Sequence, residues 1–436
     1  RHIRTFEKIV KNYFVIYIKN ADNVKIKSEE NTYNCIVDAR AEADDNPDNS
    51  SSENGNAAIY AACDLKLVGK GALSVTGNYN NGIQSKDDIS IKNVTIKVNA
   101  VNNAIKGNDE AAIESGEIIA ISRKGDGIKT SNSSLSNKGN QKGNVIISGG
   151  NIDIYAACDG IDAAYGVDVS GDGNLNIYTD TYSDYSEAVA ADNSGSSANS
   201  VGNPPDMNNS SSNSGNNPDM KGNFGGRNSA ANGMPGNNSS GNSSKKSYST
   251  KGIKADSEIN ISGTAINISS TDDGIHANSD SGVLETGEDG KGIISISGGT
   301  ITISTGDDGI HADKELNITD GYINVLTSYE GLEAITINIS GGQSFVYAAD
   351  DGINACTGDG TSTPLINITG GYVDVTTGSG DTDGIDSNGS YTQSGGMVLV
   401  KGGSSSGQVS GSIDVDGNIT ITGGTCVALG GICETP

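Results

Sequence analysis

Apolar residues recur along this chain in short alternating runs of the kind found in β-strands. In residues 309–327 three such runs follow one another, separated by glycine or polar residues. The alternating apolar positions are Ile310 and Ala312, then Leu316 and Ile318, then Ile323 and Val325. Alternation with a period of two predicts strands with one buried face, so this segment predicts one coil with three strands and three corners.

A phrase of the form Asp-Gly-Ile-X-Ala marks the start of such coils. It occurs at 159–163, 273–277, 308–312 and 351–355, and related phrases begin other coils, often about 22 residues apart. The Ile or Leu positions are Ile59, Ile83, Ile105, Ile128, Ile161, Ile253, Ile275, Ile310, Leu332, Ile353, Ile385 and Ile413. A fixed period with strand patterning predicts a solenoid. We expect an all-β, right-handed, single-stranded parallel β-helix of about 12–13 coils, each of about 22 residues and three short strands.

The longest departure from the period divides the chain into segments. Residues 1–12 are unplaced, 13–185 form the N-terminal half of the β-helix, and 251–436 form its C-terminal half. Between them, residues 186–250 are rich in Asn, Ser, Gly, Pro and Met, a composition that predicts a flexible insertion. Because the phrase resumes at Gly252-Ile253, we favour one continuous β-helix over two helices joined by a linker.

Shorter insertions gather at one corner of the predicted coil. They follow the strand that begins at the phrase, and they comprise Ser131–Lys142, Ser279–Lys291 and Thr357–Pro364. Insertions on one side of a solenoid often mark its binding face, although a corner can simply tolerate extra length.

The net charge of the chain narrows the classes of molecule that it is expected to bind. The chain has 436 residues and a formal net charge of −26, which argues against nucleic acid and against an anionic membrane surface. It favours cations, either as structural ligands or as bridges to an acidic partner. No run reaches the roughly 18 apolar residues of a membrane span. The high content of Ser, Asn, Gly, Thr and Asp is typical of a secreted or cell-surface protein, which we expect to be a monomer.

Aspartates occupy the same corner of successive coils. Two carboxylates about 5 Å apart repel by roughly 3 kcal/mol at an effective dielectric constant near 20, so a column of them favours bound cations. Hard oxygen ligands at flexible corners suit Ca²⁺, and His276 and His311 would flank such sites. The candidate ligands are Asp126, Asp159, Asp162, Asp272, Asp273, Asp307, Asp308, Asp350, Asp351, Asp383 and Asp386. The alternative is a solvated acidic ridge or protons shared along the column. In this interpretation Gly turns the corner, Ile fills the core and Asp is surplus to folding.

Lysines and tyrosines supply two further candidate sites. Lys129 or Lys254 could act as the base of a β-elimination lyase beside a Ca²⁺-bound uronate, although an exposed lysine is more often only solvated. Four tyrosines fall at outward or edge positions of the third strand and could form a stacking strip for a polysaccharide: Tyr155, Tyr322, Tyr347 and Tyr372. Tyr is also a good strand former.

Several segments resemble a known family. Asn56-Ala-Ala-Ile-Tyr60, residues 73–83, residues 85–91 and the repeated Ile-Ser-Gly-Gly-Thr-Ile-Thr-Ile are similar to secreted bacterial carbohydrate-binding domain proteins. The resemblance covers roughly residues 13–436 and implies a polysaccharide-lyase-like parallel β-helix. It also implies association with calcium and with plant cell-wall polysaccharides, namely cellulose and pectin-like polygalacturonate.

Three functions remain open from the sequence. The first is a Ca²⁺-binding extracellular protein that binds acidic pectin-like polysaccharide, cellulose or both. The second is a Ca²⁺-dependent polysaccharide lyase, and the third is a structural adhesin without glycan specificity. The resemblance favours binding over catalysis.

Overall fold

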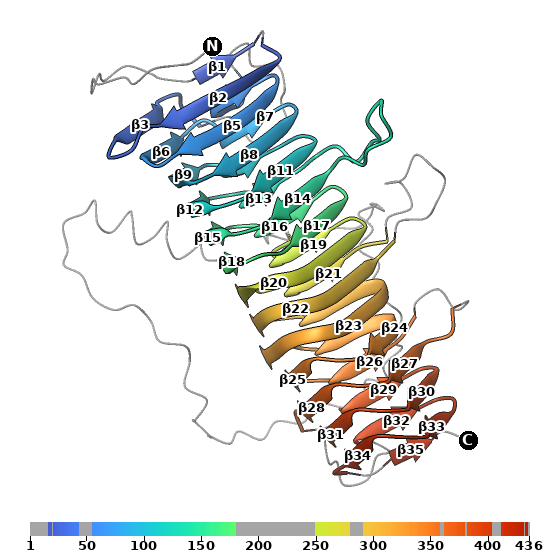
Figure 1. Cartoon of the computed structure of the whole chain (residues 1–436). Helices are drawn as coiled ribbons and strands as arrows, with labels where there is room; N and C mark the ends of the chain where they lie inside the picture. The colour runs from blue at the N-terminus through green and yellow to red at the C-terminus, as the bar shows by residue number, and fades with distance from the viewer. Residues whose placement is uncertain are drawn as a thin grey trace, which may run out of the picture.

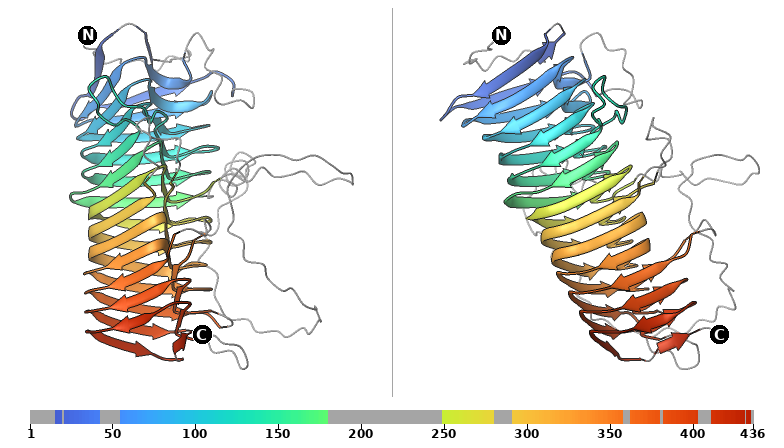
Figure 2. Two further views of the ribbon diagram at one scale, coloured as in Figure 1. Left: turned by 90° about the vertical axis from the view of Figure 1, so that its right-hand side faces the viewer. Right: turned by 45° about the vertical axis from the view of Figure 1, so that its right-hand side comes forward.

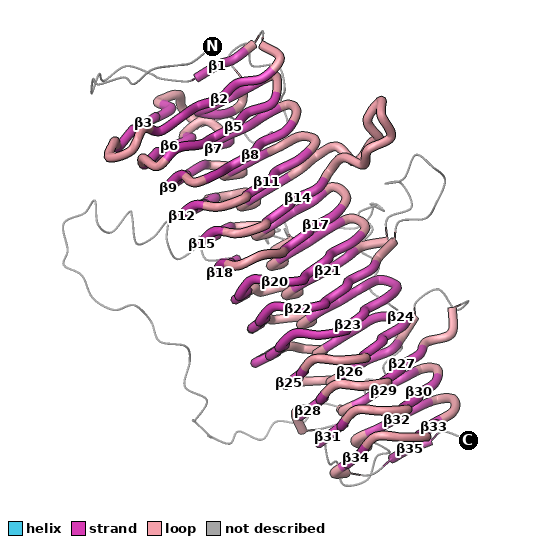
Figure 3. Tube along the Cα trace, viewed as in Figure 1, coloured by secondary structure: helices cyan, strands magenta, loops and turns pink. Residues whose placement is uncertain are grey.

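A computed structural model describes most of the chain. The described residues are 16–19, 21–42, 55–179, 249–279, 291–357, 362–379, 382–402, 411–430 and 432–434. Within them every regular element is a β-strand, and none is a helix (Figure 3). The strands stack from β1 (Ile16–Ile18) at one end to β35 (Ile432–Glu434) at the other (Figure 1). No helix among the described residues could span a membrane.

Three parallel ladders build the stack, because each strand pairs with strands from the preceding and following coils. The first ladder begins each coil and contains β1, β4 (Ala57–Ala61), β7 (Asn81–Ser85), β10 (Ile105–Lys106), β13 (Ile128–Lys129), β16 (Ile161–Ala163), β19 (Ile253–Ala255), β21 (Ile275–Ala277), the start of β23 (Ile310–Thr327), the start of β24 (Leu332–Ile339), β26 (Ile353–Ala355), β29 (Ile385–Ser387), β32 (Ile413–Val415) and β35.

The second ladder follows it along the chain. It contains β2 (Asn23–Ser28), β5 (Asp64–Gly69), β8 (Asp88–Lys92), β11 (Glu110–Ile113), β14 (Asn144–Ile147), β17 (Gly166–Val169), the first parts of β20 (Glu258–Ser269) and β22 (Ile293–Ser304), the middle of β23, the end of β24, β27 (Leu365–Ile368), β30 (Ser390–Gln393) and β33 (Ile419–Ile421).

The third ladder closes each coil. It contains β3 (Tyr33–Asp38), β6 (Ala72–Gly77), β9 (Val94–Ala100), β12 (Gly116–Ser122), β15 (Gly150–Ala156), β18 (Gly173–Thr179), the last parts of β20, β22 and β23, β25 (Gln343–Ala348), β28 (Tyr372–Thr377), β31 (Met397–Lys401) and β34 (Thr425–Ala428). The three faces of the stack are seen from further sides in Figure 2.

This arrangement confirms the predicted all-β parallel solenoid. Every predicted phrase isoleucine lies in register in the first ladder; for example, Ile83 pairs with Ile105, and Ile310 pairs with Leu332. The hand of the coil and the number of coils stay predictions. Strand β16 pairs with β19 through Ile161 and Ile253, although residues 180–248 lie outside the described residues. The predicted insertion 186–250 therefore falls almost entirely outside them.

The core is a single column of stacked aliphatic side chains. In the coil of β23, the six predicted inward residues are at most 1% exposed. Burying each Ile, Leu or Val side chain contributes roughly 1.5–3 kcal/mol, and the same positions repeat in the neighbouring coils. Side chains of successive coils thus stack on one another, and the core runs from Val24 to Val415.

The glycine of the phrase is required by close packing rather than by a left-handed backbone. A Cβ atom on Gly160 would lie 2.2 Å from Ile177 Cγ2 and 2.6 Å from the carbonyl oxygen of Gly252. Gly160 is not among the glycines with positive φ, whereas Gly150, in the Gly-Gly pair of a different corner, has φ 105°. Glycine is therefore needed at this corner because the neighbouring coil leaves no room for a Cβ atom.

Candidate functional site

A column of side chains lines the corner that leads from the third ladder into the first. We call this set the corner column; it consists of the residue two positions before the first inward residue of each first-ladder strand. Its described members are Ala57, Asn81, Asn103, Asp126, Asp159, Lys251, Asp273, Asp308, Glu330, Asp351, Asp383, Gly411 and Gly430.

Each Asn or Asp of this column forms a hydrogen bond with the column member of the next coil. Its Oδ1 atom accepts the backbone N–H of that residue. The donor and acceptor pairs are Asn103 to Asn81 (3.1 Å), Asp126 to Asn103 (3.0 Å), Asp159 to Asp126 (3.2 Å), Lys251 to Asp159 (2.8 Å), Asp308 to Asp273 (3.2 Å), Glu330 to Asp308 (3.3 Å), Asp383 to Asp351 (2.8 Å) and Gly411 to Asp383 (2.7 Å). Since a buried N–H needs an acceptor, these aspartates support the fold. The expectation that Asp is surplus to folding is wrong.

The second carboxylate oxygen contacts a lysine or histidine three residues further along the chain in several coils. Asp126 Oδ2 accepts a hydrogen bond from Lys129 Nζ at 2.8 Å. Asp273 Oδ2 lies 2.6 Å from His276 Nδ1. The aspartate therefore performs two tasks, because Oδ1 joins the coils while Oδ2 binds charge.

The first acidic cluster lies around β13 and β16. Asp126, Asp159 and Asp162 bring carboxylate oxygens within 4.8 Å of one another. Lys129 Nζ contacts both Asp126 and Asp162, and Lys254 Nζ lies 3.3 Å from Asp162. Burial and then the charges of Asp126 and Asp162 raise the pKa of Asp159 to about 7. The two lysine ammonium groups therefore already offset much of the negative charge of these three predicted metal ligands.

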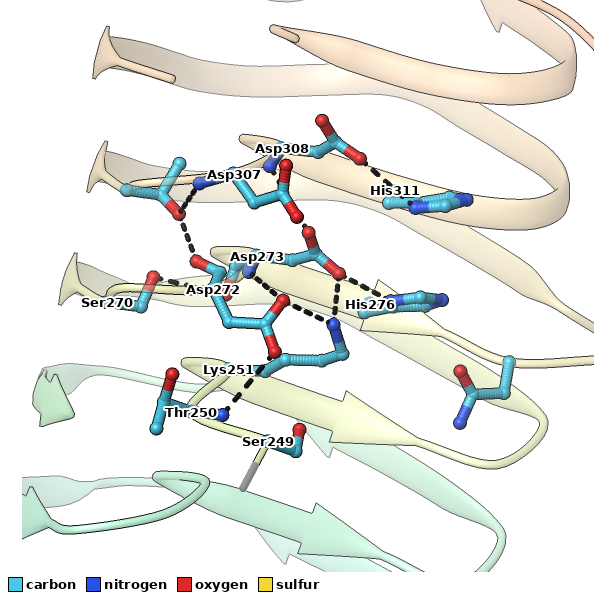
Figure 4. Close-up of polar contacts among 12 residues, drawn as sticks. Ser249, Thr250, Lys251, Ser270, Asp272, Asp273, His276, Asp307, Asp308 and His311 are labelled. Carbon is cyan, nitrogen blue, oxygen red and sulfur yellow. Dashed lines mark hydrogen bonds and ion pairs between the residues drawn. The ribbon is translucent and has the colours of Figure 1, made fainter. Parts of the chain in front are cut away.

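The second cluster contains Asp272, Asp273 and Asp307 (Figure 4). Lys251 Nζ lies 2.7 Å from Asp272 Oδ1 and 2.5 Å from Asp273 Oδ2. Lys251 occupies a corner-column position at which most neighbouring coils carry an acidic residue. This exchange of an acid for a lysine is visible in the sequence, but the sequence interpretation did not include Lys251 in the site. Asp307 is more exposed; partial burial, then Asp308 and Asp273, raise its pKa to about 6.

The third cluster lies on β24, β26 and β29, where the residue after Gly-Ile or Gly-Leu is not basic. Its corner-column members are Glu330, Asp351 and Asp383, and its outward residues are Glu333, Asn354 and Asp386. Burial and the neighbouring charges of Glu333 and Asp308 raise the pKa of Glu330 to about 9. Burial and the charges of Asp351, Asp383, Asp414 and Asp416 raise the pKa of Asp386 to about 8.

One buried oxygen in this third cluster has no hydrogen-bond partner within the described structure. Asn354 is 7% exposed, and its Nδ2 donates to Glu330 Oε2 at 2.7 Å. Its Oδ1 atom, however, is buried without a donor. A buried acceptor beside several carboxylates fits a cation better than it fits an apolar contact.

The two lysines predicted as catalytic bases are held as cations. Burial lowers the pKa of Lys129, but the charges of Asp126 and Asp162 outweigh it and raise the pKa above its ordinary value. The pKa of Lys254 is also raised, because Asp162 and Asp256 outweigh burial. A general base must be deprotonated near the working pH, so this geometry disfavours the lyase hypothesis.

The predicted tyrosines occupy the outer face of the third ladder in two separate places. Tyr155 stacks on Tyr178 with ring centroids 5.2 Å apart. Farther along, Phe345 lies between Tyr322 and Tyr372, with centroid distances of 5.3 and 5.5 Å. Phe345 was missed by the sequence interpretation, although its position between buried Ser344 and Val346 marks it as outward.

A shallow depression of about 340 Å³ lies on this face across β23, β25 and β28. Its outward side chains are Asn324, Leu326, Phe345, Tyr347, Asp374 and Thr376. Tyr347 is 38% exposed and lies three residues before the acidic corner at Asp350. The depression thus combines aromatic rings with amide and carboxylate groups.

A family model and a curated protein that match this chain carry the same description. A family model described as "Carbohydrate-binding domain-containing protein" matches residues 9–288 and 281–382. A curated protein of Acetivibrio thermocellus (strain ATCC 27405) with the same description is 40% identical over 85 residues, which are 19% of this chain and 28% of that protein. A solved structure, the gadolinium derivative of a polysaccharide lyase-like protein from C. thermocellum, is 36% identical, with a TM-score of 0.33. That match covers 39% of this chain and 65% of the solved one, so both matches span less than two thirds of the relatives' length.

Proposed function

Because this chain belongs to the carbohydrate-binding domain-containing protein family, we propose that it binds plant cell-wall polysaccharide outside the cell, with Ca²⁺ at its acidic corner. The proposed polymers are acidic pectin-like chains, bridged by the metal, and cellulose, which suits the same aromatic face. The depression on the third ladder is the observation that carries this proposal.

The depression has the chemistry of a sugar-binding surface. Phe345 and Tyr347 line the depression, and Tyr322 and Tyr372 contact Phe345 on either side, so these rings offer apolar faces to pyranose rings. Asn324 and Asp374 lie beside them and supply groups that can hydrogen-bond sugar hydroxyls. Successive coils are about 4.8 Å apart, close to the length of one sugar unit in an extended polysaccharide, so a chain can run along the stack.

Ca²⁺ fits the third acidic cluster better than the other two. Glu330, Asp351, Asn354, Asp383 and Asp386 supply only oxygen donors, and the partnerless Oδ1 of Asn354 is among them. Ca²⁺ takes 6 to 8 oxygens at flexible sites, so residues of two neighbouring coils, namely Asp351, Asn354 and Asp386, would hold it together with water. When bound, the ion supplies positive charge that offsets the carboxylates and attracts the uronate carboxylates of a pectin-like chain.

Binding assays with the full chain test this proposal. The protein is incubated with insoluble polygalacturonate or with cellulose, in excess Ca²⁺ or in EDTA, and the bound fraction is measured. We expect polygalacturonate binding to be lost in EDTA and cellulose binding to persist. Phe345→Ala or Tyr347→Ala should weaken both by about 2- to 10-fold, the equivalent of about 0.5–1.5 kcal/mol per ring.

Tyr155→Ala is the matched control. Tyr155 is 37% exposed on the same ladder but lies outside the depression, so its replacement should leave binding unchanged. If neither polymer is bound with or without Ca²⁺, the proposal is wrong. If Ca²⁺ then still raises the melting temperature, the structural adhesin becomes the better explanation.

A further inference from the structure

Two histidines lie one above the other beside the second acidic cluster. His276 on β21 pairs in register with His311 on β23, and their rings are stacked with centroids 4.3 Å apart and planes inclined by 19°. Figure 4 shows both rings on the same side of successive strands. Their side chains are 12% and 23% exposed, so they are largely covered yet reachable from solvent.

Both imidazoles direct the same nitrogen toward one carboxylate oxygen. His276 Nε2 lies 3.1 Å from Asp313 Oδ1, and His311 Nε2 lies 3.7 Å from the same atom. Donors bound at roughly 2.0–2.2 Å to a tetrahedral ion are about 3.3 Å from one another. The two nitrogens therefore lie at ligand-to-ligand separations from Asp313 Oδ1.

The other polar atom of each of these three side chains is anchored. His276 Nδ1 lies 2.6 Å from Asp273 Oδ2. His311 Nδ1 lies 3.3 Å from Asp308 and 3.4 Å from Glu333.

Asp313 is held in the same way at its second oxygen. Its Oδ2 accepts hydrogen bonds from the backbone N–H of Ser279 at 2.8 Å and from the Ser279 hydroxyl at 3.2 Å. Metal-binding histidines typically have a carboxylate on the second nitrogen, and metal-binding carboxylates are themselves hydrogen-bonded.

We propose that His276 Nε2, His311 Nε2 and Asp313 Oδ1 form a site for a divalent transition-metal ion such as Zn²⁺. Two imidazoles and one carboxylate suit such ions, whereas Ca²⁺ requires oxygen ligands. Three protein ligands leave a position for water or for an oxygen of a bound molecule. The proposal is independent of the Ca²⁺ proposal, because the ligands and the preferred metals differ.

Zn²⁺ is titrated into the full chain and its binding is measured by calorimetry, in excess CaCl₂ so that Ca²⁺ sites are already filled. We expect a single Zn²⁺ ion to bind and both His276→Asn and His311→Asn to weaken binding at least tenfold. Asparagine is tolerated at this register position, because Asn354 occupies it two coils further on. Asp308→Asn, which changes only a supporting carboxylate, should weaken binding by about 10- to 100-fold.

His2→Asn is the matched control, since it removes the third histidine of the chain, which lies outside the described residues. It should leave Zn²⁺ binding unchanged. Co²⁺ provides a second readout, because four-coordinate Co²⁺ has intense visible absorption that Asp313→Asn should diminish. Absence of Zn²⁺ binding by the wild-type chain, or wild-type affinity in either single-histidine variant, would show that the imidazoles only bridge carboxylates and would overturn the proposal. Circular dichroism of each variant establishes that it is folded.

Discussion

Replacing Asp159 separates the two tasks of a corner aspartate, namely joining the coils and carrying charge. Its Oδ1 accepts the Lys251 N–H at 2.8 Å and the Ser249 hydroxyl at 2.7 Å, and the residue is 3% exposed. Asp159→Asn keeps the accepting oxygen and removes the charge, whereas Asp159→Ala removes both. Asn103 shows that an amide fits this column.

The expected magnitudes follow from these contacts. Asp159→Ala leaves the Lys251 N–H without its acceptor, which costs about 1–3 kcal/mol of unfolding free energy relative to Asp159→Asn. Burial, then Asp126 and Asp162, raise the folded-state pKa of Asp159 to about 7. A raised pKa contributes stability that is fully present below the unfolded value of about 3.9 and is lost as pH rises through about 7. The wild type therefore loses up to about 4 kcal/mol over this range that the Asn variant does not lose.

Urea unfolding followed by circular dichroism at pH 4 and pH 8 measures both effects. We expect Asp159→Asn to match the wild type at pH 4 and to exceed it at pH 8. Asp159→Ala should be less stable than Asp159→Asn at both values. Asn103→Ala is the neutral control, because it removes the acceptor of the Asp126 N–H, 3.0 Å away, without changing charge. Equal stability of the Ala and Asn variants of Asp159 at both pH values would refute the coil-joining role.

Three further outcomes are expected. Lys251→Met should destabilise the protein by about 1–3 kcal/mol in urea unfolding, because Asp272 and Asp273 lose the lysine while Asp273 keeps its contact with His276; an unchanged midpoint would contradict this. Gly160→Ala should lower the free energy of unfolding by about 1–3 kcal/mol, since the new Cβ would lie 2.2 Å from Ile177 Cγ2. A stability equal to that of the wild type would show that the coils can separate freely there. In EDTA the melting temperature should fall as the pH rises from 6 to 9. The pKa of Asp386 is raised to about 8, so the stability that its protonated form contributes is lost as the pH rises through that value. Asp386→Asn should reduce the fall in melting temperature, and excess Ca²⁺ should abolish it.

The coil could be predicted because its signals are local. Alternation of apolar residues identifies the strands, and the repeated phrase identifies where each coil begins, so Ile83, Ile105 and Ile128 were placed in register correctly. Outward and inward positions follow from the same period of two. The reason for the phrase glycine could not be read in this way, because the atoms that exclude a Cβ at Gly160 belong to another strand and to the next coil.

The candidate sites were only partly predictable. The pattern indicated that carboxylates share a corner, and the structure does bring Asp126, Asp159 and Asp162 together. It did not indicate that Oδ1 of each would accept a backbone N–H, because the donor is on the next coil. Nor did it place Phe345 between Tyr322 and Tyr372, since aromatic contacts between coils depend on the register of the third ladder.

By itself the sequence determined the repeating coil, its three strands, its buried aliphatic positions and the excess of acid at one corner, all of which depend on residues within about one period. The tertiary structure alone decided which charges meet. Asp159 and Lys251 are 92 residues apart in the chain and lie one coil apart in space. Whether an aspartate faces a lysine, a histidine or another carboxylate depends on which coils stack, and that is settled by the packing of whole coils rather than by any local pattern.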